Sequence, residues 1–189
     1  MEEQEDRIVV GLDIGTTKVC AIVASIDPQD RINILGVGKA PSDGLNRGVV
    51  VNIDKTVNAI QTAVEQAQLA SGIEVNSVNV GIAGDHIRSM RSKGVITINN
   101  RDNEITVDDV ERLLEDCQRI MLPTDQQIIH VIPQEFVVDG QDGISDPVGM
   151  SGMRMEAEVH IITGLVSAAK NIYRCVERAG YQVADIILE

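Results

Sequence analysis

The sequence predicts an α/β protein with a five-stranded mixed sheet, helices packed on that sheet, and an inserted β-α-β-β lobe. Three apolar, strand-like segments at the start follow one another across gaps too short for a crossover helix, which favours an antiparallel meander. Two later segments each pair a helical pattern with a short apolar strand, which adds two parallel strands to the sheet. Between these two pairs the chain turns more polar and carries strands and a helix of its own. This order is typical of a lobe inserted into a continuous domain.

The meander strands are expected at residues 8–13, 18–26 and 31–38, which are rich in Val and Ile. Short turns of Gly, Pro and Asp separate them. A strand that crosses to a parallel neighbour needs a longer connection, usually a helix. We therefore expect these three strands to pair antiparallel in chain order.

A helix is predicted next, because apolar residues recur there at helical spacing. They are Val57, Ile60, Val64 and Ala67. Either Asn52 or Asp54 could cap the amino end of this helix, and Gly72 is a typical helix stop. The fourth strand of the sheet is expected at residues 77–83, where Gly84 closes it.

Residues 85–162 are expected to form the inserted lobe. A strand is predicted at 94–98, followed by the run 106–109 (T-V-D-D), which resembles a helix capping box with Asp in place of the usual Glu. The helix behind it carries one apolar face. That face consists of Val110, Leu113, Leu114, Cys117 and Ile120.

Two further strands of the lobe are expected at 127–138 and 153–162, joined by a glycine-rich turn at 140–152. Pro133 interrupts the first of these strands. Because proline cannot donate a ladder hydrogen bond, we expect a sheet edge or a bulge at Pro133.

The helix-then-strand order returns after Thr163, with a last helix ending at Gly180 and a strand at 183–188. The apolar face of this last helix consists of Val166, Ala169, Ile172 and Val176. The predicted division of the chain is a discontinuous domain of residues 7–84 and 163–189, the lobe, and a disordered tail at 1–6. Because a complete protein rarely ends directly behind such a strand, the chain is expected to be a fragment.

The charge and residue composition exclude several classes of partner and site. The formal net charge is −13 and no Lys/Arg cluster occurs, which argues against nucleic acid and anionic membranes as partners. The cysteines are three, widely spaced, and the histidines 86, 130 and 160 show no ligand spacing. A disulfide framework and a metal site in this part are therefore not expected. The acidic start is no signal peptide and no apolar run reaches the roughly 18 residues of a membrane span. These features fit a cytoplasmic protein.

A polar group of residues interrupts the apolar segments of the first hairpin: Asp13, Gly15, Thr16, Thr17 and Lys18. A P-loop is excluded, because the glycines are too close and the lysine follows the hydroxyls. A plain hairpin turn would use the glycine and threonines but would leave Asp13 and Lys18 as solvated charges. A phosphate-binding turn uses all five residues. Amides and hydroxyls of 15–17 would meet an anion, Lys18 would add charge toward a β-phosphate, and Asp13 would face a hydrated Mg²⁺.

The D-I-G-T-T-K turn on this core resembles the first phosphate motif of the actin, heat-shock-70 and sugar-kinase superfamily, whose fold is ribonuclease H-like. The lobe inserted after the fourth strand resembles the FtsA family, the bacterial actin-like division proteins. Three stretches carry this resemblance: 130–144 (H-V-I-P-Q-E-F-V-V-D-G-Q-D-G-I), 147–155 (P-V-G-M-S-G-M-R-M) and 168–180 (A-A-K-N-I-Y-R-C-V-E-R-A-G). The resemblance extends from residue 8 to residue 189.

The resemblance implies a cytoplasmic adaptor that binds ATP with Mg²⁺, polymerises, anchors the FtsZ ring to the inner membrane at the division septum, and recruits later division proteins. Hydrolysis would be weak at best. The chain would correspond to lobes 1A and 1C. Without the second phosphate motif, the adenosine motif, the lobe that meets FtsZ and the C-terminal membrane helix, it would lack half of the nucleotide site and bind ATP weakly or not at all.

The resemblance also assigns two further roles. Related ATPases carry Gln or Glu after the last strand to position the attacking water, so Glu189 could serve that role; alternatively it is a carboxylate without function. The 85–162 lobe, including Pro133, would be the surface for self-association and for later division proteins. The alternative from another class is a sugar or acid kinase of the same superfamily, which would need an Asp base that cannot be singled out here. An actin-like pilus or cell-shape protein fits the 130–136 stretch less well.

Overall fold

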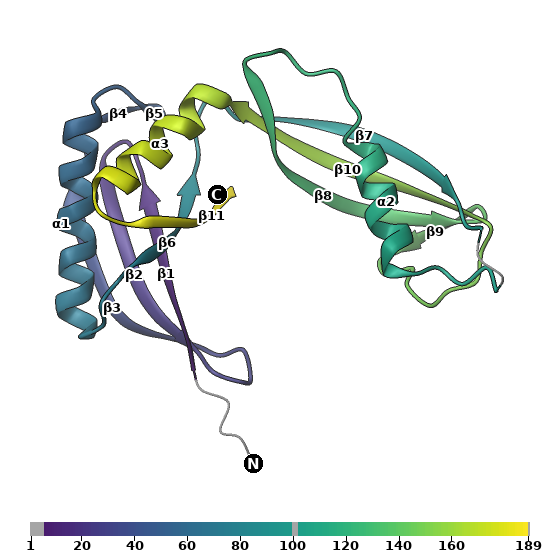
Figure 1. Cartoon of the computed structure of the whole chain (residues 1–189), viewed down its shortest axis with the longest axis horizontal. Helices are drawn as coiled ribbons and strands as arrows, with labels where there is room; N and C mark the ends of the chain where they lie inside the picture. Colours follow the sequence, from purple (N-terminus) through teal and green to yellow (C-terminus); the bar gives the residue numbers. More distant parts are fainter. Residues whose placement is uncertain (1–5, 100–101, 189) are drawn as a thin grey trace. The chain divides into compact units, whose positions relative to one another are not determined.

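A computed structural model describes residues 6–99 and 102–188 of the chain (Figure 1). The structure divides into two compact units, which are described separately. The first unit holds the residues up to 86 and those from 166 onward, and the second unit holds residues 87–165. The tail expected to be disordered lies, apart from Asp6, outside the described residues.

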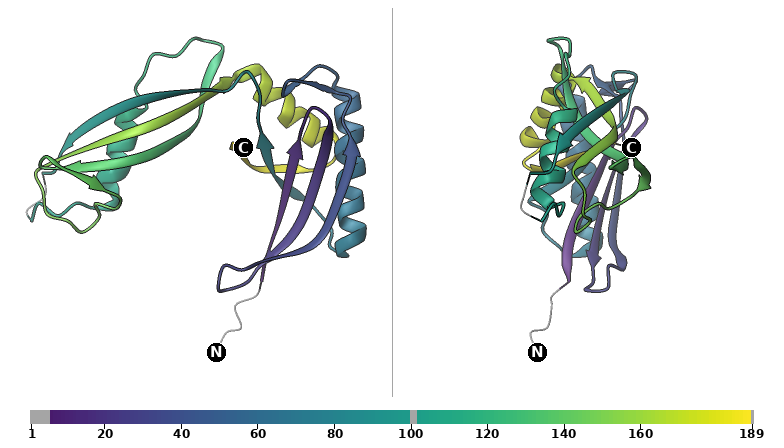
Figure 2. Two further views of the ribbon diagram at one scale, coloured as in Figure 1. Left: turned by 180° about the vertical axis from the view of Figure 1, so that it is seen from behind. Right: turned by 90° about the vertical axis from the view of Figure 1, so that its right-hand side faces the viewer.

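The first unit contains a five-stranded sheet and two α-helices. Its elements are β1 (Arg7–Ile14), β2 (Lys18–Ile26), β3 (Ile32–Pro41), β4 (Leu45–Asn46), β5 (Val49–Val50), α1 (Ile53–Ser71), β6 (Ser77–Ile82), α3 (Val166–Arg178) and β11 (Gln182–Leu188). The strand order is β11-β6-β1-β2-β3, with β4 and β5 forming a separate small hairpin. Strands β1, β2 and β3 pair antiparallel, whereas β6 pairs parallel with both β1 and β11. The predicted mixed sheet, a meander extended by two crossovers, is confirmed (Figure 2).

Both helices of the first unit pack on one face of the sheet. Alternate residues of the central strands are buried on that face: Val10, Leu12, Ile14, Val19, Ala21, Val23, Val78 and Val80. Helix α1 comes closest to β3, where glycines replace side chains. An added Cβ at Gly38 would lie 1.9 Å from the carbonyl oxygen of Ala63, so only glycine allows this approach. The opposite face, with Gly11 and Ile22 exposed, is not covered by either helix.

The ends of α1 are determined by local sequence. The side chain of Asn52 accepts a hydrogen bond from the amide of Lys55 at 3.0 Å, so Asn52 rather than Asp54 is the cap. Asp54 lies in the first turn, where it accepts a 2.7 Å hydrogen bond from Arg178 of α3. Gly72 ends the helix in the left-handed conformation with φ of 70°, as the sequence predicted.

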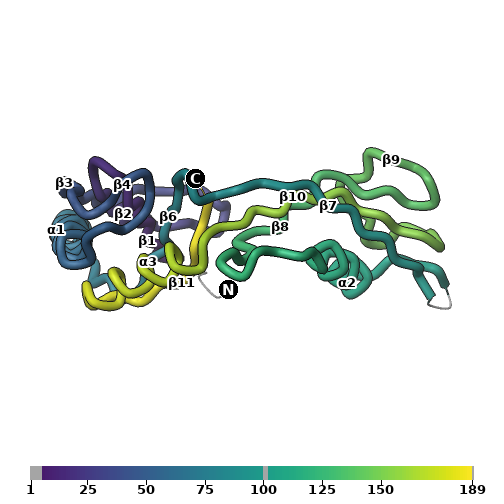
Figure 3. Tube along the Cα trace, turned by 90° about the horizontal axis from the view of Figure 1, so that it is seen from above, coloured from purple at the N-terminus to yellow at the C-terminus, as the bar shows by residue number. Residues whose placement is uncertain are grey.

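The second unit is a four-stranded antiparallel sheet with one helix on one face (Figure 3). Its elements are β7 (Arg88–Thr97), α2 (Val107–Cys117), β8 (Gln126–Val138), β9 (Gln141–Ile144) and β10 (Arg154–Leu165), in the sheet order β7-β10-β8-β9. Leu113 and Cys117 of α2 are fully buried against the sheet. At Gly94 of β7, an added Cβ would lie 2.6 Å from the Cys117 sulfur, so the helix sits tightly on the strand.

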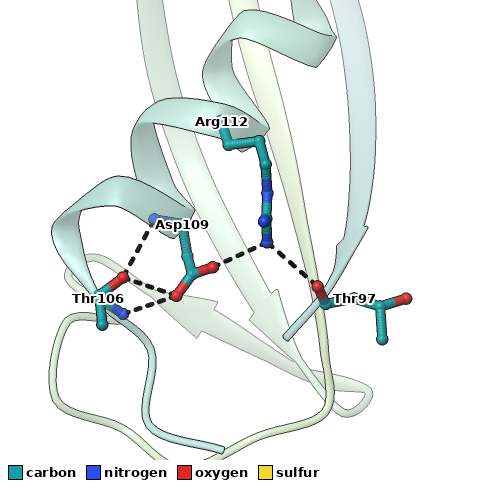
Figure 4. A network of polar contacts seen from close by, with 4 residues as sticks. All are labelled: Thr97, Thr106, Asp109 and Arg112. Carbon is teal, nitrogen blue, oxygen red and sulfur yellow. Dashed lines mark hydrogen bonds and ion pairs between the residues drawn. The ribbon is translucent and has the colours of Figure 1, made fainter. Parts of the chain in front are cut away.

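The amino end of α2 carries the predicted capping box (Figure 4). The Thr106 hydroxyl accepts from the Asp109 amide at 3.3 Å, and the Asp109 carboxylate accepts from the Thr106 amide at 3.1 Å. Arg112 links the box to β7, because it donates to Asp109 at 2.8 Å and to the Thr97 carbonyl at 3.2 Å. Burial alone would raise the pKa of Asp109, but the Thr106 hydrogen bonds and the Arg112 charge outweigh it and lower the pKa.

Pro133 lies on an edge of the sheet and beside a bulge. Strand β9 pairs only with the end of β8, from Phe136 to Val138, so among the described residues no strand pairs with that side of β8 at residues 133–135. The register with β10 shifts at this point, because Glu158 pairs with Glu135 and Val159 with Pro133. The expectation of an edge or a bulge is confirmed, and the structure has both.

Strand β9 was not predicted; a turn was expected at 140–152. The signal for it is the pair Asp139-Gly140, whose φ values of 48° and 88° fit a two-residue hairpin turn between β8 and β9. Within the described parts of the chain, no helix is both long and apolar enough for a membrane span.

Candidate functional site

A cavity of about 510 Å³ opens in the first unit where strands β1 and β6 end. Because these two strands are parallel neighbours, the segments that follow them meet at one edge of the sheet. The tip of the β4–β5 hairpin supplies the third part of the wall. The lining residues are Asp13, Ile14, Gly15, Thr16, Arg47, Gly48, Ala83, Gly84 and Asp85.

The turn between β1 and β2 is tight and forms one wall of this cavity. Ile14 of β1 pairs with Val19 of β2 on either side of this turn. The Gly15 amide donates a hydrogen bond to the Lys18 carbonyl at 3.0 Å, which closes the turn. An added Cβ at Gly15 would lie 3.0 Å from that same carbonyl oxygen. The Gly15 amide is therefore used within the turn. Among the described residues, no hydrogen bond uses the amides of Thr16 and Thr17, which remain available to an anion.

The predicted site residues divide between two cavities. Asp13, Gly15 and Thr16 line the first cavity. Asp13 and Lys18 line a second cavity of about 530 Å³ on the sheet face that the helices leave uncovered. Thr17 lines neither; its carbonyl accepts a 3.1 Å hydrogen bond from the Ser42 amide. The structure thus brings Asp13 together with both the turn and the lysine.

The β4–β5 hairpin contributes residues that the sequence reasoning missed. Its two-residue turn consists of Arg47 and Gly48, with φ of 50° and 78°, the left-handed pair of a type I′ turn. The tip packs backbone to backbone against the end of β6, since an added Cβ at Gly48 would lie 1.9 Å from the Ala83 carbonyl oxygen. The Gly48 amide also donates to the Thr16 hydroxyl at 3.4 Å. This packing fixes the hairpin tip against the turn after β1.

The segment after β6 adds a charged rim. Asp85 pairs with Arg47 at 3.6 Å, and both side chains are largely exposed. The neighbouring His86 has a buried Nδ1 for which the described residues offer no hydrogen-bond partner. Burial lowers the pKa of His86, and the Asp85 charge opposes this shift in part. We expect the imidazole to be neutral at physiological pH.

The donor set of the first cavity suits a phosphate that carries Mg²⁺. Magnesium in proteins keeps several waters and is held by one or two carboxylates together with substrate phosphates. Asp13 provides such a carboxylate and Thr16 provides an amide and a hydroxyl for phosphate oxygens, while Thr17 is the next residue of the same turn. In the residues that the structure covers, no three side chains of His, Cys, Asp or Glu group into a metal site.

Two other predicted sites are not part of this geometry. Glu189, the candidate water-positioning residue, lies outside the described residues. Pro133 is exposed on β8 of the second unit, before the part of that strand that pairs with β9. The thiols of Cys117 and Cys175 are free and buried, and burial raises the pKa of each, so neither is a reactive nucleophile.

Comparison with known proteins shows similarity to bacterial division proteins. A family model described as the SHS2 domain inserted in FtsA matches residues 84–163. The chain is 47% identical over 186 residues to cell division protein FtsA of Pseudomonas aeruginosa, covering 98% of the chain and 44% of the relative. Identity to FtsA of Bacillus subtilis is 41%, over 97% of the chain and 42% of the relative. Identity to FtsA of Escherichia coli K12 is 40%, over 96% of the chain and 43% of the relative. The chain therefore spans less than half of the length of these relatives.

Among solved structures, the chain is similar to one from a PilM-PilN type IV pilus biogenesis complex. The TM-score is 0.65 with 12% sequence identity, covering 95% of this chain and 47% of the other. At this identity the similarity concerns the fold alone. It shows that a similar arrangement of chain segments occurs in a solved structure.

Proposed function

We propose that this chain belongs to the FtsA family and acts within an ATP-binding, actin-like division adaptor. This adaptor polymerises, anchors the FtsZ ring to the cytoplasmic face of the inner membrane at the septum, and recruits later division proteins. The observation that carries the proposal is the cavity at the D-I-G-T-T-K turn. It combines the open amide and the hydroxyl of Thr16 with the Asp13 carboxylate, in a chain that is 40–47% identical to proteins named cell division protein FtsA.

The first cavity is proposed as the phosphate part of the ATP site. Amides and hydroxyls of Thr16 and Thr17 would donate to phosphate oxygens, with Gly15 allowing the close approach. Asp13 would bind the hydrated Mg²⁺ through water, and Lys18 would place its ammonium on the side of the second cavity. When bound, Mg²⁺ would neutralise phosphate charge. We infer weak hydrolysis at best, with Glu189 as the candidate residue for positioning water.

The inserted unit is proposed as the assembly surface. At residues 133–135 of β8, which are exposed and which β9 does not reach, the backbone offers a position where a neighbouring subunit or a partner strand could add. We assign lobe 1A to residues 7–84 with 163–189, and lobe 1C to residues 85–162. Contacts with FtsZ and with the membrane are assigned to parts of the protein outside this chain, and nucleic acid is not a proposed partner.

Nucleotide binding by the full-length protein tests the proposal. Isothermal titration with Mg-ATP should give saturable binding to the wild type. D13A should abolish the Mg²⁺-dependent part while the melting temperature stays within a few degrees, because Asp13 is at a strand end and not in the core. D125A removes an exposed acid from the second unit, far in sequence from the cavity, and serves as the control for the loss of one carboxylate. Normal Mg-ATP affinity in D13A would refute the assignment.

The kinase alternative is not favoured, because the relatives above are named as cell division proteins. It makes a distinct prediction that the same preparation can test. A kinase would consume ATP only when a sugar or acid acceptor is supplied, whereas the adaptor would show the same slow rate with or without acceptors.

A further inference from the structure

We propose that Arg47 is a phosphate-binding residue of the nucleotide site, and that Asp85 is the counterion it leaves when the terminal phosphates arrive. This inference rests on the proposed nucleotide function. It adds a residue from a different chain segment to the site that the first hairpin builds.

The backbone conformation of Arg47 is the first observation. The structure gives positive φ to four residues other than glycine, Asp30, Arg47, Asn103 and Asp139, in the part of the chain that it describes. Three of these are Asp or Asn, which adopt the left-handed region most easily after glycine. Arg47 is the exception. A long side chain held in this region costs free energy, and such strain concentrates at functional sites.

The packing around the hairpin tip explains why Arg47 stays in this conformation. Gly48 and Gly84 allow the two backbones to touch: an added Cβ at Gly84 would lie 2.6 Å from the Arg47 carbonyl oxygen. The Gly48 amide donates to Thr16, the residue proposed to bind phosphate. The hairpin is therefore a fixed support that points one side chain at the cavity mouth.

The charges of the cavity wall are the second observation. Of the described residues that line this cavity, Arg47 alone is cationic, against the two acids Asp13 and Asp85. Lys18 lines the other cavity. Bound as its Mg²⁺ complex, the triphosphate still carries negative charge. Without Arg47, the charged side chains among the described lining residues would all be carboxylates.

The pair between Arg47 and Asp85 is suited to exchange. Its 3.6 Å separation is long, and the side chains are 80% and 74% exposed. Exposed pairs of this kind contribute little to stability, so the pair by itself does not account for an arginine in a strained position. A phosphate, like a carboxylate, accepts two parallel hydrogen bonds from a guanidinium, and the triphosphate carries more negative charge than the single carboxylate of Asp85. Phosphate oxygens at the cavity mouth would therefore displace Asp85.

The test is Mg-ATP binding to the full-length variant R47N. Asparagine is a favoured residue in this turn conformation, so the melting temperature should be unchanged or higher. Loss of a charged hydrogen-bond donor to phosphate should raise the Kd for Mg-ATP roughly tenfold or more. The Kd for adenosine, measured by competition, should change less than about twofold between R47N and the wild type. An equal loss for adenosine would mean a structural defect and would overturn the inference.

Two further variants sharpen the result. R31N removes another exposed hairpin arginine that pairs with an aspartate, Asp27, and should leave Mg-ATP affinity unchanged. D85N should bind Mg-ATP as tightly as the wild type or more tightly. If D85N weakened Mg-ATP binding as much as R47N does, the Arg47–Asp85 ion pair would be needed to hold the cavity wall in place, and the proposed exchange of Asp85 for phosphate would be wrong. Normal affinity in R47N would overturn the role of Arg47 alone, whereas absence of Mg-ATP binding to the wild type would overturn the proposed function as well.

Discussion

Replacing Leu113 by alanine tests whether the second unit is an independent folding unit. Leu113 is 0% exposed and lies in a cluster that includes Phe136, Met155 and Val159. The substitution removes three carbon atoms, worth about 2.5 kcal/mol in transfer free energy. The α2 helix already touches β7 at Gly94, so the site has little room to collapse and a cavity cost is added. We expect a total of about 3–4 kcal/mol.

Leu114 provides a matched control on the same helix. It is only partly buried, so L114A should cost about 1 kcal/mol or less. Urea denaturation followed by far-UV circular dichroism gives both values for the full-length protein. A cost for L113A no greater than that of L114A would contradict the packing argument.

Hydrogen exchange locates the destabilisation of L113A. A loss of about 3.5 kcal/mol corresponds to a few hundred-fold faster exchange for amides that open with the unit. We expect this acceleration in β8 and β10, with amides of β1, β2 and α1 unchanged. Equal acceleration in both units would show that they unfold together, and would refute their independence.

Three further predictions concern other parts of the chain. G38A should cost about 1–3 kcal/mol in urea denaturation, because its Cβ would clash with the α1 backbone, while G11A, where nothing lies within 4 Å, should cost much less. Because the pKa of Asp109 is lowered in the folded state, its stabilisation is complete above its ordinary pKa near 3.9 and is lost as the pH falls toward the folded value; D109N should flatten this acid limb of the stability curve. Deleting residues 85–162 from the full-length protein should keep ATP binding but abolish filaments or recruitment of later division proteins, as seen by electron microscopy and pulldown; normal results in both assays would exclude the lobe from assembly.

The sequence predicted best those elements whose limits depend on local chemistry. Helix α1 illustrates this, since an apolar stripe, a cap at Asn52 and a stop at Gly72 lie within the helix or next to it. The strands of the meander were also predictable from local sequence, because their Val- and Ile-rich segments are separated by short turns of Gly, Pro and Asp. The capping box of Thr106 and Asp109 was also predictable, because these two residues are only three positions apart in the sequence.

Strand β7 shows where such local signals fail. A strand was expected at 94–98, but β7 spans Arg88–Thr97. Its first half is polar and exposed, so hydrophobicity does not mark it. Pairing with β10 creates this half of the strand, for example between Arg91 and His160. A long-range partner of this kind cannot be read from the strand's own residues.

The same distinction divides the candidate site. Asp13, Gly15 and Thr16 belong to one contiguous motif, and their placement at one cavity follows from the turn. Arg47 and Asp85 reach that cavity only through the packing of the hairpin tip against the end of β6. Arginine is also an unusual residue in a left-handed turn, so local turn preferences do not predict a tight hairpin at residues 47–48.

The connectivity of the chain links this site to the inserted unit. Asp85 lies on the cavity wall, and the second unit begins at Ile87. If phosphate displaces Asp85 from Arg47, the change occurs in the segment through which the chain leaves the first unit. The deletion of 85–162 removes Asp85 but keeps Arg47, so the loss of the competing carboxylate supports retained or tighter ATP binding in that variant. Nucleotide binding and assembly would then be separable by deletion, yet coupled in the intact protein through the residues between Gly84 and Ile87.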